Sequence, residues 1–142
     1  MKTFFNTTVK YQKQNDEGLL KEITEQYLVD AVNFTEAEAK VIEYLAPEVT
    51  GGVSVARVSK TNISSIIDNE KGVYYKAKVS YLSVDEEAGK EKKINDFVLI
   101  GEESFEKAFL ELNNDLQKFT VPVEIESMVK TKILEVVWHD SE

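Results

Sequence analysis

The sequence of 142 residues contains no cysteine, one histidine, two prolines and six glycines. Without cysteine, the chain can form no disulfide and offers neither a thiol nucleophile nor a thiolate metal ligand. The lone His139 is a weak basis for a catalytic or metal site, because it lies beside the C-terminus without a second histidine. No apolar run is long enough for a membrane span or a secretory signal. We therefore expect a cytoplasmic protein that makes no membrane contact.

Positive charge is also scarce, since 17 Lys and Arg residues oppose 26 Asp and Glu residues, for a net charge of -9. Binding to duplex nucleic acid or anionic lipid requires basic side chains that displace counterions, so this balance argues against both. We assign most of the acidity to solubility. The apolar fraction of 42% and the charged fraction of 30% are typical of a folded globular protein.

Catalytic motifs are absent as well. The sequence contains no phosphate-binding glycine loop, nucleophile elbow, dinucleotide fingerprint or paired-histidine motif. The acidic residues 85–87 fall in an expected turn and lack the spacing of a calcium loop. The sequence therefore predicts no enzyme activity, no cofactor and no metal site.

What the sequence does contain is an internal duplication. An alternating apolar and aromatic pattern opens each half, which predicts a half-buried strand, and a turn-like polar segment and a second strand follow. The matched residues are Phe5, Thr7, Val9 and Tyr11 with Tyr75, Ala77, Val79 and Tyr81, at an offset of 70, and Ile23, Leu28 and Val29 with Ile94, Leu99 and Ile100, at an offset of 71.

A helix is expected next in each half. Apolar residues spaced three and four apart define one face of it: Phe34, Ala37, Val41 and Leu45 in the first half, and Phe105, Ala108, Leu112 and Leu116 in the second. Thr35 is the expected N-cap of the first helix, with Glu38 closing a capping box. Glu103 or Ser104 takes the capping position in the second.

The last part of each half repeats most closely. Val53, Val55, Lys60, Thr61, Ile63, Ile66 and Ile67 match Val123, Ile125, Lys130, Thr131, Ile133, Val136 and Val137. Its β-branched residues predict two short strands, or one strand broken by a bulge at Lys60 and Lys130. A helical turn over residues 63–67 is the competing interpretation.

These patterns predict an α+β fold in which a β-β-α-β unit, with a further strand possible, is duplicated. We expect mainly antiparallel sheet, as two sheets or one, two helices that cover apolar faces, and a pseudo-two-fold relation between the halves. Residues 1–142 are expected to form a single domain of two repeats, 1–70 and 71–142, with the polar segment 68–72 as the linker.

Five residues are candidate contacts for a ligand or partner. Arg57 is the only arginine, and guanidinium groups suit bidentate binding of phosphate or carboxylate. Lys60-Thr61 and Lys130-Thr131 repeat, so two lysines could flank one small anionic ligand or contact a two-fold partner. An exposed strand arginine and a shared ancestry of the pairs are the alternative explanations.

The aromatic residues of the first strands suggest a different function. Phe4, Phe5, Tyr11, Tyr74, Tyr75 and Tyr81 could stack bases of single-stranded nucleic acid on an open sheet. Few basic residues accompany them, and period-two alternation places half of them in the core.

The segments Tyr27-Leu28-Val29-Asp30-Ala31 and Phe34-Thr35-Glu36-Ala37-Glu38 resemble the signature of a domain-of-unknown-function family of small proteins from Bacteroidetes bacteria and their phages. The resemblance covers nearly the whole chain, with one departure at Gln26, where that family is expected to have proline. It implies a phage or mobile-element accessory protein and carries over no catalytic residue.

The expected function is therefore non-enzymatic binding, either of a host protein or of a small sequestered ligand, by a monomer or homodimer. Single-stranded nucleic-acid binding is the alternative. An enzyme that uses a carboxylate pair created by folding is a third hypothesis.

Overall fold

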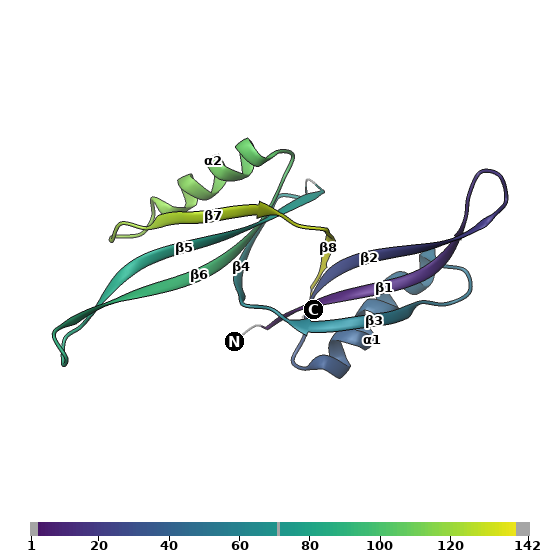
Figure 1. The fold of residues 1–142 in the computed structure, drawn as a ribbon, viewed down its shortest axis with the longest axis horizontal. Helices are drawn as coiled ribbons and strands as arrows, with labels where there is room; N and C mark the ends of the chain where they lie inside the picture. The colour runs from purple at the N-terminus through teal and green to yellow at the C-terminus, as the bar shows by residue number, and fades with distance from the viewer. Residues whose placement is uncertain (1–2, 71, 139–142) are drawn as a thin grey trace. The chain divides into compact units, whose positions relative to one another are not determined.

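The computed structural model describes residues 3–70 and 72–138, which divide into two compact units (Figure 1). The first unit contains the described residues of Met1–Thr61 and Lys132–Glu142, and the second contains Asn62–Thr131. In each, a helix covers one face of a mainly antiparallel sheet. The fold is α+β, as the sequence predicts, and the similarity of the two sheets fits the duplication.

The first unit has the sheet order β3-β1-β2-β8. Strand β1 is antiparallel to both of its neighbours, β2 and β3, while β8 runs parallel to β2 at the sheet edge. The elements are β1 (Phe4–Gln14), β2 (Leu20–Asp30), α1 (Phe34–Leu45), the 3₁₀ helix η1 (Ala46–Glu48), β3 (Ser54–Lys60) and β8 (Ile133–Val137).

The second unit has the corresponding order β4-β6-β5-β7. Here β5 is antiparallel to β6 and β7, and β4 runs parallel to β6. The elements are β4 (Ile63–Asp68), β5 (Val73–Asp85), β6 (Lys90–Glu102), α2 (Phe105–Leu116) and β7 (Glu124–Lys130).

Each core lies between a helix and one sheet face. In the first unit Ala37, Val41 and Leu45 of α1 are buried on the inner side chains of the sheet. Ala108, Leu112 and Leu116 of α2 occupy the same places in the second. These are the faces that the three- and four-residue spacings predict, except that Phe34 and Phe105, at the first position of each helix, are 53% and 49% exposed. Fully burying one large aliphatic side chain contributes roughly 1.5–3 kcal/mol, so the matched faces account for much of the helix docking.

The final strand of each sequence half joins the sheet of the other half. Strand β8 follows β7 in the chain but pairs with β2, and β4 follows β3 but pairs with β6 (Figure 1). The interpretation as two short strands is thus confirmed. The helical turn over 63–67 and the single bulged strand are wrong, because strand pairing stops after Lys60 and Lys130 and resumes at Ile63 and Ile133.

This exchange places the unit boundaries after Thr61 and Thr131, not between the repeats. The predicted linker between the halves falls between β4 and β5, which belong to the same unit. Sequence periodicity identifies related segments, but it does not specify which sheet edge a strand will pair with. A single domain with pseudo-two-fold symmetry stays a prediction.

The helix caps differ in part from expectation. Asn33, not Thr35, is the N-cap of α1, and its side chain accepts a hydrogen bond of 2.8 Å from the backbone N–H of Glu36. The Glu36 carboxylate in turn accepts from the N–H of Val32 at 3.1 Å, so Glu38 does not close the box. In α2 the cap is Ser104, one of the two predicted residues.

No helix in the described residues is long and apolar enough to cross a membrane. His139, the one histidine, lies outside the described residues.

Candidate functional site

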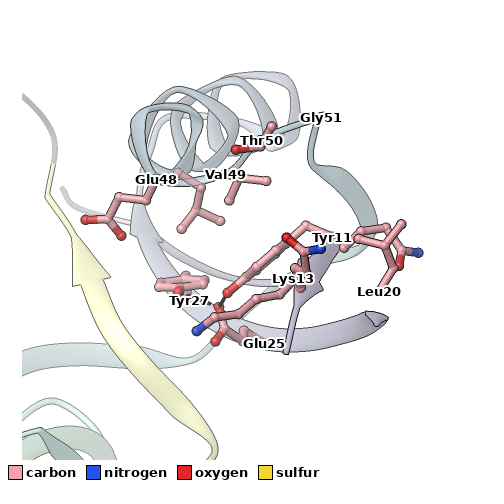
Figure 2. A pocket seen from close by; sticks show the side chains of 12 residues that line it. Tyr11, Lys13, Leu20, Glu25, Tyr27, Glu48, Val49, Thr50 and Gly51 are labelled. Carbon is pink, nitrogen blue, oxygen red and sulfur yellow. Dashed lines mark hydrogen bonds between the residues drawn. The ribbon is translucent and has the colours of Figure 1, made fainter. Parts of the chain in front are cut away.

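A pocket of about 660 Å³ opens in the first unit beside the β1–β2 hairpin (Figure 2). Tyr11 comes from β1, Glu25 and Tyr27 come from β2, and Val49 and Thr50 lie across the pocket in the segment after η1. Gly51, with a φ of +106°, follows them in a conformation that side chains with a Cβ rarely adopt. This turn carries the chain from η1 toward β3 and so builds the wall opposite the strands.

Hairpin register brings the polar groups of this pocket together. Glu25 and Tyr27 are two residues apart and therefore share a sheet face. Tyr11 pairs with Ile23, so it is a diagonal neighbour of Glu25. The Tyr11 hydroxyl donates to Oε1 of Glu25 at 2.8 Å, and the Tyr27 hydroxyl donates to the same oxygen at 2.9 Å.

The surroundings favour the protonated form of both phenols. Burial raises the pKa of Tyr11, and the hydrogen bond to Glu25 and the charges of Glu25 and Glu48 raise it further. The pKa of Tyr27 is raised by burial first, then by Glu25, with a smaller contribution from Glu135. Each hydroxyl therefore remains a donor to the Glu25 carboxylate near neutral pH.

One oxygen of this carboxylate accepts no hydrogen bond from the described residues. A carboxylate has two acceptor oxygens with about four lone-pair sites in total. Both tyrosines use Oε1 of Glu25, and no hydrogen bond from the described residues reaches Oε2. Glu25 is half-buried at the pocket wall. The pocket thus presents a fixed carboxylate acceptor beside the half-exposed ring of Tyr11.

Further charged groups surround this acceptor. Glu48 and Lys13 also line the pocket. Tyr44 of α1 packs edge-to-face on Tyr27, with ring centroids 6.1 Å apart, and its hydroxyl donates to Glu135 of β8. Three carboxylates and one ammonium therefore lie in or next to the pocket, and the local charge favours a positively charged ligand.

The second unit provides an internal comparison, because it has a pocket at the same place in the fold. This pocket of about 360 Å³ contains Tyr81, Asp96 and Val98, which align with Tyr11, Glu25 and Tyr27. No hydrogen bond joins Tyr81 to Asp96 in the part of the chain that the structure describes. The fold therefore does not require the two-tyrosine arrangement around a carboxylate.

The threonines of the repeated Lys-Thr pairs have a structural role. Thr61 donates to the carbonyl oxygen of Phe4 through its N–H at 2.9 Å and its hydroxyl at 2.8 Å. Thr131 makes the same two bonds, at 2.9 and 2.8 Å, to the carbonyl oxygen of Tyr74. Each threonine fixes the chain where it leaves one sheet and enters the other.

The basic candidates lie away from the pocket lining. Lys60 and Lys130 are exposed at the ends of β3 and β7, in different units. Arg57 is exposed on β3, where its Nε donates to the hydroxyl of Ser59 at 3.1 Å. A ligand contact by any of these three stays a prediction.

Sequence reasoning identified Tyr11 as a strand aromatic but missed its two partners. Two features of the sequence could have pointed to these partners. Glu25 and Tyr27 are spaced to share one face of a strand, and they differ from the matched residues of the second half, Asp96 and Val98. Combining them requires the register of the hairpin, which its turn determines.

No cluster of three or more His, Asp or Glu side chains able to hold a metal ion occurs among residues 3–70 and 72–138.

Comparison with known proteins identifies one relationship. No curated protein and no solved structure matches the chain. The family model described as Domain of unknown function (DUF4494) matches residues 3–139, nearly the whole length, and the chain belongs to that family.

Proposed function

We propose that this chain is a non-enzymatic binding protein and that the pocket of its first unit binds a cationic group that donates N–H bonds, such as an amine or a guanidinium. One observation carries the proposal: Oε1 of Glu25 accepts from Tyr11 and Tyr27, while Oε2 receives no bond from the described residues. The tyrosines fix the carboxylate in place, so a ligand loses little affinity to side-chain ordering.

The half-exposed ring of Tyr11 adds to this recognition. A cation within about 6 Å of a tyrosine ring gains roughly 0.5–2 kcal/mol, depending on how far it is desolvated. A hydrogen bond to a charged group contributes about 1.5–3 kcal/mol. Together these two interactions favour a ligand with a cationic end. Val49 and Leu45 in the same pocket can accommodate an apolar body attached to it.

A small anion at the Lys-Thr pairs has less support. Both threonine hydroxyls already donate to backbone carbonyl oxygens. Only exposed lysines would then contact the anion, and they would do so without fixed donors.

Single-stranded nucleic-acid binding also has less support. Phe4, Phe5, Tyr74 and Tyr75 are each 5% exposed or less. Buried rings cannot stack on bases, which leaves Tyr11 and Tyr81 as the half-exposed members of the set.

The biological setting belongs to the same proposal. The sequence resemblance supports a phage or mobile-element accessory protein of Bacteroidetes that acts in the cytoplasm on a host protein or a host ligand. Affinity capture from the cytosol of such a host, with mass spectrometry of the protein and small-molecule fractions, tests this setting.

The pocket is tested by amide NMR titration with agmatine and cadaverine, and with pentanediol and glutarate as neutral and anionic controls. We expect the two cations alone to shift resonances of residues 11, 25, 27 and 49. The Glu25→Gln variant should lose these shifts, whereas Glu22→Gln, an exposed change on the same strand, should retain them. Equal shifts with pentanediol, or none with either cation, would overturn the proposal.

A further inference from the structure

The second unit exposes a set of apolar side chains around the distal part of β5. We define the β5 edge surface as Leu82, Val84, Phe119 and Val121, which are between 43% and 62% exposed. A hollow of about 440 Å³ is lined by Leu82, Val84 and Val121, and the 360 Å³ pocket is lined by Phe119 and Val121. Tyr81 and Val121 line both, so the surface is continuous.

The first unit shows that the fold does not need these apolar residues. On the strand the aligned positions are polar, since Gln12 and Gln14 of β1 correspond to Leu82 and Val84. At one hairpin position the difference is reversed, since Leu20 aligns with Glu91. Exposed apolar patches rimmed by polar residues mark interaction sites, and here the same fold exists without the patch.

The distal part of β5 has no strand partner on its β7 side, where Val121 and Pro122 line the same hollow as Leu82 and Val84. Strand β5 pairs with β6 as far as Asp85, but its pairing with β7 ends where Ser80 meets Glu124. From Tyr81 onward, no described strand lies on the β7 side of β5. Leu82 and Val84 are two residues apart and share a face of this open edge. A free strand edge with apolar side chains at period two suits the addition of an extended peptide.

The charges around the surface specify the peptide further. Of the basic residues lining the two hollows, Lys93 is paired with Glu126 at 2.9 Å and Lys118 with Asp115 at 3.2 Å. Glu91, Asp96 and Glu124 line the same hollows and have no described ion-pair partner. A second copy of this chain, with a net charge of -9, would bring like charge to this rim.

We infer that the β5 edge surface binds an extended segment of a partner protein in which apolar side chains alternate with lysine or arginine. This surface would be the place where the proposed function engages a host protein. It does not depend on the pocket of the first unit.

The test uses a labelled eight-residue peptide in which Leu, Phe and Val alternate with Lys, and two controls in which the lysines are replaced by Glu or the apolar residues by Ser. Fluorescence anisotropy with the full chain should show binding of the first peptide only. NMR should place it at residues 82, 84, 119 and 121 and leave residues 11, 25 and 27 unshifted.

The decisive variant makes the β5 edge surface polar: Leu82→Gln and Val84→Gln, as at the aligned positions of β1, with Phe119→Glu and Val121→Thr. It should fold, as judged by its amide spectrum, because all four side chains are at least 43% exposed. We expect the variant to bind the Lys peptide at least about tenfold more weakly, which corresponds to about 1.4 kcal/mol. Leu110→Gln and Val129→Thr, exposed apolar changes elsewhere in the unit, should leave the affinity unchanged.

Three results would overturn the inference. The first is equal affinity of the wild type and the four-residue variant for the Lys peptide. The second is binding of the Glu peptide as tightly as the Lys peptide. The third is a concentration-dependent dimer of the wild type that the variant abolishes, which would make a second copy the occupant. The peptide and agmatine are followed at different residues. A negative result for peptide binding is therefore distinguishable from a negative result for agmatine binding in the first unit.

Discussion

At the scale of single residues, hydrogen bonds account for the threonine of each repeated Lys-Thr pair. Each makes two hydrogen bonds to one carbonyl oxygen at a crossing point of the chain. We predict that Thr61→Val and Thr131→Val each lower the free energy of unfolding by about 1 kcal/mol, because the hydroxyl bond is lost. Urea unfolding measures this. Thr24→Val on an exposed strand position should stay within about 0.5 kcal/mol, and an equal loss there would contradict the assignment.

Tyr11 gives a second residue-scale prediction, concerning alkaline pH. Its pKa in the folded chain is raised above the value of 10.0 for an unperturbed tyrosine, mainly by burial and then by Glu25. The folded state therefore favours the protonated phenol, so this contribution to stability is complete below about pH 10 and is lost as pH rises through the folded pKa. The free energy of unfolding should fall more steeply above pH 10 in the wild type than in Tyr11→Phe. Identical slopes would show that Tyr11 does not contribute.

At the scale of elements, substitutions at the start of α1 can distinguish Asn33 from Thr35 as the N-cap. Asn33 and Ser104 accept hydrogen bonds from the first turns of α1 and α2. We predict that Asn33→Ala and Ser104→Ala each cost about 1 kcal/mol in urea unfolding. Thr35→Ala, inside the first turn and exposed, should cost less than about 0.5 kcal/mol. A larger loss for Thr35→Ala than for Asn33→Ala would restore Thr35 as the cap.

The elements themselves follow closely from local sequence patterns. Period-two alternation predicted β1 and β5, and three- and four-residue spacing predicted the buried faces of α1 and α2. The first cap was missed because Asn33 and Thr35 are both good capping residues two positions apart. Their backbone conformations decide between them, and Asn33 is extended, with a φ of -157° and a ψ of 175°.

At the scale of the whole chain, what the sequence could not predict is the partner of each final strand. Ile133, Val136 and Val137 are apolar and β-branched, which indicates a strand but not the edge that it joins. The structure pairs this strand with β2, so the first unit is built from both ends of the chain. Strand pairing also limited the prediction of the pocket, because Tyr11 contacts Glu25 only in the register of the β1–β2 hairpin.

This arrangement predicts how fragments behave. Residues 62–131 contain every strand of the second sheet, so we expect this fragment to unfold cooperatively in urea as a monomer. The sequence repeat 71–142 lacks β4, which leaves an edge of β6 unpaired and separates β8 from β2. It should be unfolded or self-associated through that edge. Cooperative monomeric unfolding of 71–142, with none for 62–131, would contradict the exchanged pairing.

The two units share a fold and differ in the surfaces beside their hairpins. In the first, two tyrosines donate to Glu25 at the wall of a pocket, and in the second, Asp96 shares its pocket with exposed apolar side chains such as Phe119 and Val121. The unequal surfaces are consistent with one scaffold carrying two different binding sites. The proposed function depends on the first of these sites, the pocket that contains Glu25.

The most direct measurement is calorimetric titration of agmatine into the wild-type, Glu25→Gln and Glu22→Gln proteins at one ionic strength. Loss of the Glu25 charge should weaken binding at least about tenfold, because a hydrogen bond to a charged group contributes about 1.5–3 kcal/mol. Glu22→Gln changes the net charge equally and should leave the affinity within about twofold of the wild type. Equal affinities for the wild type and Glu25→Gln would show that the carboxylate held by Tyr11 and Tyr27 does not bind the cation.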